Sequence, residues 1–225
     1  MDAEFIFGGK LMSTTKKSNT KVLVECALLI AIATVLNVVC SFIPFLNLPF
    51  GGGFTICSML PIVLAAYRNG TKWGLLTGFV YAVVQMLLGF KTVSAFFMPS
   101  SDSYMVLWKA ICVCLIDYII AYTVLGFGGI FRNKIKNPSA SLCVGSIVAL
   151  SLRYIFFGTW AEWFFSQDGF TLGAKILEKF SGQGLALLYS VIYNGLYMIP
   201  EIIITAIVAL IIGRVPQITG KKSAE

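Results

Sequence analysis

The stretch GLALLYSVIYNGLYMIPEIIITAIVALIIG, residues 184–213, decides the class of fold, because its only charged residue is Glu201. About 20 consecutive apolar residues can cross the hydrocarbon core of a bilayer as a helix, so this stretch predicts a spanning helix that is long enough to tilt. Five further apolar stretches precede it, at residues 22–45, 54–68, 73–90, 105–131 and 140–165. The second of these is short and follows three consecutive glycines at 51–53. The sequence therefore predicts an all-α membrane protein with six transmembrane helices.

The composition of the 225-residue chain agrees with this prediction and excludes several kinds of chemistry. Hydrophobic residues make up 58% of the chain and charged residues 12%, and the mean hydropathy is +0.86, whereas soluble domains are about 25% charged. The chain contains no histidine, which excludes Ser-His-Asp triads and His-ligated zinc or haem. It also lacks a P-loop motif for ATP, and only one aspartate, Asp117, lies in an apolar stretch. We therefore expect neither an enzyme nor a bound cofactor or metal.

The distribution of Lys and Arg predicts which ends of the spans face the cytoplasm. Basic residues accumulate in cytoplasmic loops, and with the N-terminus inside, twelve of the 17 basic residues fall on the cytoplasmic side: Lys10, Lys16, Lys17, Lys21, Arg68, Lys72, Arg132, Lys134, Lys136, Arg214, Lys221 and Lys222. Lys91, Lys175 and Lys179 fall outside. Both termini are therefore predicted to be cytoplasmic. Since the basic residues adjoin apolar spans, the net charge of +7 does not indicate a nucleic-acid partner.

The chain is expected to form a single domain. Residues 1–20 form a polar N-terminal tail, in which 1–11 (MDAEFIFGGKL) resemble an added leader before a second start at Met12. Residues 21–215 form the six-helix transmembrane domain, and 216–225 form a cytoplasmic tail.

Four charged residues lie inside the predicted spans: Lys109, Asp117, Arg153 and Glu201. Each costs about 2.5–3.5 kcal/mol at a helix centre, so each needs a partner or a function. Two interpretations of Asp117 stay open: an ion pair such as Asp117–Arg153, or a counter-charge for a bound ligand. Glu201 follows Pro200, where a helix loses one backbone hydrogen bond, and a structural role is favoured for it.

Aromatic side chains gather near the predicted outer ends of spans three to six. They are Phe96, Phe97, Tyr104, Trp108, Trp160, Trp163, Phe164, Phe165, Tyr189, Tyr193 and Tyr197. An interfacial belt explains such clustering in many membrane proteins. A ligand cage is the alternative, because aromatic faces attract cations by about 2 kcal/mol or more when desolvated. Asn194 lies among these residues and needs hydrogen-bond partners at membrane depth, which a polar heterocycle could supply.

Three segments in the right order resemble the thiamine-specific substrate-binding (S) components of energy-coupling factor (ECF) vitamin transporters. They are 58–76, with SMLPI and YRNGTKWGLL, then 115–118 (LIDY), and 189–201 (YSVIYNGLYMIPE). The resemblance extends over nearly the whole chain from Val22 to Val215. It implies a six-helix membrane fold whose pocket opens to the outside.

The same resemblance implies the residues that bind the ligand. Asp117 and Tyr118 correspond to an acid followed by Tyr on helix four, Tyr189 and Asn194 to the Tyr and Asn of helix six, and an aromatic of helix three falls at Tyr81. The family often has a His and then a Trp on helix five, where this sequence has Phe157 and Phe165. Trp160 and Trp163 are therefore assigned the stacking role.

The resemblance also implies partners. Ala27 and Ala31 fit the A-x-x-x-A pattern with which helix one of the family contacts a transmembrane coupling subunit, and alanines four apart let two helices approach closely. Packing inside the bundle is the alternative role for them. Two cytoplasmic ATPase subunits complete the transporter, which agrees with the missing P-loop.

The predicted function is capture of thiamine outside the cell and its delivery across a bacterial inner membrane. A thiamine precursor or another vitamin is the alternative ligand. Two other classes of protein remain open. One is an ion-coupled secondary carrier that uses Asp117 or Glu201 as its coupling acid, and the other is a membrane scaffold that contains only structural ion pairs.

Overall fold

The computed structural model describes residues 18–46, 54–101, 104, 106–155 and 183–220. Every regular element in these ranges is helical, which confirms the all-α prediction for the described part of the chain. The elements are α1 (Asn19–Ser41), η1 (Pro44–Leu46), α2 (Leu60–Asn69), α3 (Thr71–Leu88), α4 (Phe90–Ala95), α5 (Leu107–Val113), η2 (Cys114–Ile120), α6 (Ala121–Thr123), η3 (Val124–Asn133), α7 (Pro138–Tyr154), α10 (Gln183–Ile212) and α11 (Pro216–Thr219).

Four stretches of the described chain are long and apolar enough to cross a membrane. They are Asn19–Ser41, Thr71–Leu88, Leu107–Asn133 and Asn194–Ile212. The short predicted second span corresponds to α2, which has ten residues, and the predicted span 140–165 corresponds to α7, with 17 residues. Residues 156–165 of that span lie outside the described ranges. Six spans therefore remain a prediction.

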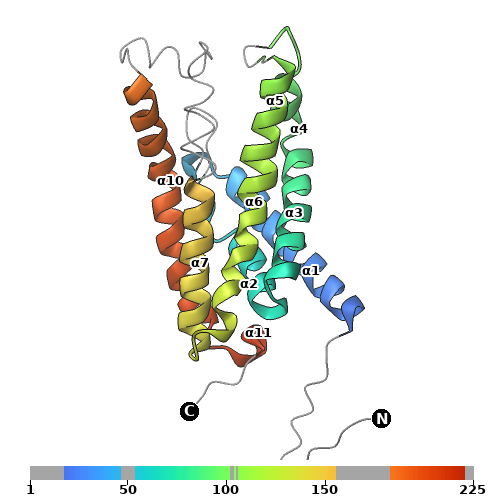
Figure 1. Cartoon of the computed structure of the whole chain (residues 1–225), viewed down its shortest axis with the longest axis vertical. Helices are drawn as coiled ribbons and strands as arrows, with labels where there is room; N and C mark the ends of the chain where they lie inside the picture. Colours follow the sequence, from blue (N-terminus) through green and yellow to red (C-terminus); the bar gives the residue numbers. More distant parts are fainter. Residues whose placement is uncertain (1–17, 47–53, 102–103, 105, 156–182, 221–225) are drawn as a thin grey trace, which may run out of the picture.

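The long helices lie side by side along the long axis of the molecule (Figure 1). α3 packs against the α6–η3 part of the helical run Leu107–Asn133, this run packs against α7, and α7 packs against α10. α1 crosses the others obliquely (Figure 1). The beginning of α1 and the short α11 lie at the same end of the bundle (Figure 1). Arg68 at the end of α2 joins them, because it forms an ion pair with Glu25 of α1 and donates hydrogen bonds to carbonyl oxygens of α11.

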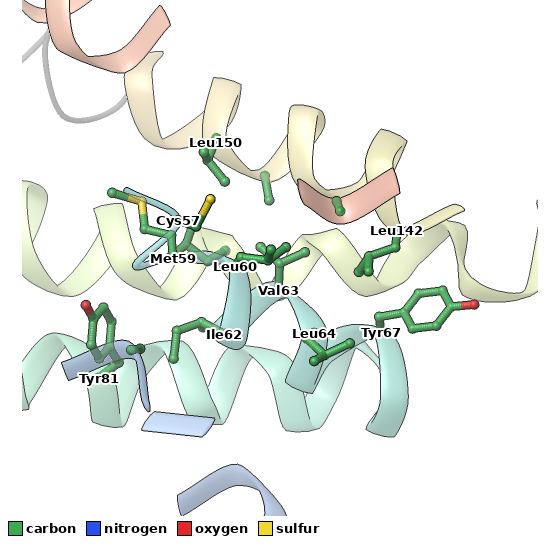
Figure 2. Packing of buried hydrophobic residues seen from close by; sticks show 14 of the residues in the cluster. Cys57, Met59, Leu60, Ile62, Val63, Leu64, Tyr67, Tyr81, Leu142 and Leu150 are labelled. Atoms are coloured by element: carbon green, nitrogen blue, oxygen red, sulfur yellow. The ribbon is translucent and has the colours of Figure 1, made fainter. Parts of the chain in front are cut away.

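The core is built around α2. Every residue from Leu60 to Tyr67 is buried. Figure 2 shows Leu60, Ile62 and Val63 between α7, with Leu142 and Leu150, and α3, with Tyr81. A helix that is apolar on all sides is stable only when neighbours cover all of it. α2 is therefore an internal helix of the bundle, which accounts for its short length.

Glycines allow η3 to contact two neighbouring helices closely. A Cβ atom on Gly145 of α7 would lie 2.2 Å from the carbonyl oxygen of Gly128, and one on Gly126 would lie 2.3 Å from the backbone nitrogen of Leu75. No larger residue fits at these contacts without moving a helix. Small residues bring helices close enough for backbone packing, as is usual between membrane helices.

Candidate ligand-binding site

The residues predicted on helix four lie in a π-helical segment, η2, which interrupts the run Leu107–Asn133. π-helical turns are rare and occur frequently at functional sites. Asp117 and Tyr118 lie at the centre of η2, and both are half-buried. Lys109 lies in the first turn of α5, close to the beginning of this helix.

Tyr81 of α3 and Tyr122 of α6 form an aromatic pair next to this segment. Their ring centroids are 5.2 Å apart and their planes meet at 89°, an edge-to-face arrangement that aromatic pairs prefer. Tyr122 lies four residues after Tyr118 in the same helical run, and α6 contacts η2. Tyr122 thus connects Tyr81, which was predicted on helix three, with Tyr118, which was predicted on helix four.

Arg153 of α7 lies against the ring of Tyr122 and is buried, with an exposed fraction of 5%. Its guanidinium carbon is 4.6 Å from the centroid of the Tyr122 ring, a cation–π contact that is strengthened by burial. Its Nη1 donates to the sulfur atoms of Met59, at 3.1 Å, and Met198, at 3.4 Å. Glu201 lies three residues after Met198 on α10 and therefore on the same side of this helix as the guanidinium. A buried cation needs such partners, because its transfer out of water is otherwise costly.

α10 presents four polar or sulfur-containing side chains to the bundle at helical spacing. Asn194, Tyr197, Met198 and Glu201 are all buried, whereas Leu196, Ile199 and Ile203 on the other face are exposed. Residues three or four positions apart lie on the same face of a helix, so these four side chains share one face of α10. The hydroxyl of Tyr197 donates to Oδ1 of Asn194, and Tyr197 is within electrostatic range of Arg153. The buried side chain of Asn194 therefore has a hydrogen-bond partner within the protein.

The comparisons with known proteins agree with one another. The model of the thiamine transporter protein family (Thia_YuaJ) matches residues 23–219. The chain belongs to this family. A protein of Bacillus subtilis (strain 168) named thiamine transporter ThiT is 30% identical over 187 residues, which are 83% of this chain and 86% of the relative. A solved structure of ThiT from Listeria monocytogenes has a TM-score of 0.53 at 23% identity, covers 89% of this chain and 97% of that chain, and supports the fold.

Membership of the thiamine transporter family confirms the predicted resemblance at the level of the family. It makes the chain a multi-pass membrane protein with a transport function rather than an enzymatic one. Among the described residues, no group of three or more His, Cys, Asp or Glu side chains could hold a metal ion.

The structure brings Tyr81, Asp117, Tyr118 and Asn194 into one connected region. Two residues that connect them, Tyr122 and Tyr197, were not among the predicted site residues. The sequence carried a signal for Tyr122, which lies four residues after Tyr118 and therefore near it on the same helix. Tyr189 lies on α10, in a part of the helix whose side chains are not described. Trp160, Trp163, Phe157 and Phe165 lie outside the described residues.

Ala27 and Ala31 are exposed on α1, while Cys26 and Ala33 face the bundle. Of the four apolar stretches, α1 is the least covered by other helices of the thiamine transporter chain. Only 17% of its most apolar window is buried, against 33–39% in the other three. The two alanines therefore lie on a face that the bundle does not use for its own packing.

Proposed function

We propose that the chain is the substrate-binding (S) component of an ECF-type importer and that it binds thiamine. The observation that carries the proposal is the π-helical segment, which places Asp117 and Tyr118 beside the Tyr122–Tyr81 pair in a chain of the thiamine transporter family. A carboxylate and aromatic faces both attract a delocalised cation such as the thiazolium of thiamine. Asn194 supplies an amide for the aminopyrimidine ring.

The remaining predicted contacts belong to the same proposal. Tyr189, Trp160 and Trp163 are assigned to the outer part of the site, where they stack on the ligand. Arg153 has contacts of its own with the Tyr122 ring and with the sulfur atoms of Met59 and Met198. We therefore assign Asp117 to the ligand rather than to a structural Asp117–Arg153 pair.

The proposed topology has six transmembrane helices with both termini cytoplasmic, in a bacterial inner membrane. Lys21, Arg68, Lys72, Arg132 and Arg214 lie near the helix ends at the end of the bundle where α1 begins and α11 lies. The positive-inside rule assigns this end to the cytoplasm.

Transport also needs partners, and we propose a transmembrane coupling subunit and two cytoplasmic ATPase subunits. The exposed face of α1 with Ala27 and Ala31 supports contact with the coupling subunit, because small side chains let a second helix approach the backbone. The chain contains no P-loop motif, so ATP hydrolysis is assigned to the partners.

The test is a thiamine titration of the purified chain in detergent, followed by tryptophan fluorescence and by calorimetry. We expect saturable binding at nanomolar to low micromolar thiamine. Binding of only the pyrimidine or only the thiazole half would replace thiamine by a precursor, and no binding of any of the three would refute the proposal. In cells, uptake that stops when the ion gradient collapses while ATP stays constant would instead identify an ion-coupled carrier.

A further inference from the structure

Gln85 of α3 carries a buried amide of which one half is bonded and the other is not. The exposed fraction of the residue is 6%. Its Oε1 accepts a hydrogen bond from Nδ2 of Asn37 in α1, at 2.9 Å. Its Nε2 is buried and has no hydrogen-bond partner among the described residues. A buried donor without a partner costs free energy, so this nitrogen is a candidate for a bond to a ligand.

The contacts of α3 with the helical run that contains η2 and α6 place Gln85 between two tyrosines of the candidate site. The two elements lie side by side (Figure 1). The ring of Tyr81 packs against that of Tyr122, with centroids 5.2 Å apart, and at the end of α3 a Cβ atom on Gly89 would lie 3.4 Å from the hydroxyl oxygen of Tyr118. Gln85 lies four residues after Tyr81 and four before Gly89, and therefore on the same face of α3, between these two contacts.

The position of Gln85 in the bundle indicates which half of thiamine it meets. The helices pack in the order α3, the helical run with η2, α7 and α10 (Figure 1), so Gln85 lies on one side of the site and Asn194 on the other. In the proposed function, Asp117 beside Tyr118 attracts the thiazolium and Asn194 bonds to the aminopyrimidine. Gln85 is therefore on the thiazolium side. The strongest uncharged acceptor in that half of thiamine is the hydroxyl oxygen of its hydroxyethyl arm, and an amide nitrogen acts only as a donor.

We propose that Gln85 is a further ligand-binding residue and that its Nε2 donates a hydrogen bond to the hydroxyl oxygen of thiamine. The bond from Asn37 to Oε1 orients the amide and leaves Nε2 for the ligand. Nε2 is covered by its neighbours in the structure, so binding includes a movement of the half-buried Tyr118 ring, which lies one turn further along α3 over Gly89. The inference rests on the proposed function for the identity of its ligand.

The test measures the Kd of two compounds by calorimetry on the full chain in detergent. They are thiamine and deoxythiamine, in which an ethyl group replaces the hydroxyethyl arm. Gln85→Met replaces the amide by an apolar side chain of similar length. Thr77→Val is the matched control, because Thr77 is also buried and lies two turns before Gln85 on the same face of α3, but its hydroxyl donates to the carbonyl of Trp73 in its own helix, at 2.7 Å.

The expected effect is that of one uncharged hydrogen bond, which corresponds to about a three- to tenfold change in Kd. The wild type and Thr77→Val should therefore bind thiamine about three- to tenfold more tightly than deoxythiamine. Gln85→Met should lose this preference. Its Kd for thiamine should rise by about the same factor, whereas its Kd for deoxythiamine should stay within about twofold of the wild type.

The comparison of two ligands separates a contact with the hydroxyl group from a structural role of Gln85. A structural role would raise the Kd of both compounds by the same factor in Gln85→Met, and this result would overturn the inference. Equal binding of thiamine and deoxythiamine by the wild type would overturn it too, and this comparison needs no variant if Gln85→Met does not fold. A wild type that binds no thiamine would refute the proposed function and this inference with it, whereas an unchanged preference in Gln85→Met would refute the inference alone.

Discussion

The two buried charged residues Arg153 and Glu201 give a prediction that can be worked out from their burial. Both residues are buried, with exposures of 5% and 1%; Arg153 lies in the last turn of α7 and Glu201 lies inside α10. Arg153→Met replaces the guanidinium by an apolar side chain of similar length that suits its surroundings, since Met59 and Met198 already lie there. The substitution leaves Glu201 buried without the positive charge that faces it.

The expected loss follows from the cost of one unpaired buried charge. Removal of one partner of a buried pair costs about 3–5 kcal/mol, whereas replacement of both partners by groups without charge is often nearly neutral. We therefore expect Arg153→Met and Glu201→Gln each to lower the free energy of unfolding by about 3–5 kcal/mol. The double variant should lose only about 2 kcal/mol, the part that comes from the contact between Arg153 and the Tyr122 ring.

The measurement is a double-mutant cycle on the free energy of unfolding, obtained by SDS titration in mixed micelles with tryptophan fluorescence as the signal. Interacting residues show coupling in such a cycle, whereas independent residues show additive losses. Leu196→Ala, on the exposed face of α10, controls for nonspecific effects of substitution in this helix. A double variant as unstable as the sum of the two single variants would refute the pairing of Arg153 with Glu201.

Three further predictions concern ligand binding, helix packing and the cytoplasmic end. Asp117→Asn should fold normally and raise the Kd for thiamine by about 10- to 100-fold, the effect of one charged hydrogen bond; calorimetry checks this, and a large loss of stability at full affinity would indicate a structural ion pair instead. Gly145→Ala should destabilise the protein by about 1–3 kcal/mol, because its Cβ would lie 2.2 Å from the Gly128 carbonyl oxygen, and an unfolding temperature equal to the wild type would contradict that close contact. Arg68→Gln should release α11 and accelerate tryptic cleavage after Arg214 several-fold, since Arg68 donates to two α11 carbonyls; an unchanged cleavage rate would show that other contacts hold this segment.

Much of the candidate site could be predicted from single residues, because a polar or charged residue inside an apolar stretch of the sequence is easily recognised. Asp117, Asn194 and Arg153 are recognisable as soon as the apolar stretches are placed, since each needs a partner or a role there. Tyr81 and Tyr118 could be selected only through the resemblance to a family. Tyr122 was missed, since a Tyr in an apolar helix costs little and carries no signal by itself.

The class of protein was determined by the sequence alone. Apolar stretches long enough to cross a bilayer, a strong bias of Lys and Arg, and the absence of histidine are properties of composition and order. They do not depend on how the helices pack, so they predicted a membrane protein without histidine-based catalytic chemistry, and the resemblance to a family added transport.

The tertiary structure decided which polar groups face one another. The sequence left an Asp117–Arg153 ion pair open, and only the packing of α7 against α10 places the sulfur of Met198 3.4 Å from the Arg153 guanidinium. The π-helical form of residues 114–120 also escaped the sequence, because it depends on contacts along the whole helix rather than on a local residue preference. Spacing along one helix can be counted from the sequence, but rotation and register between helices are set by side-chain packing over many contacts.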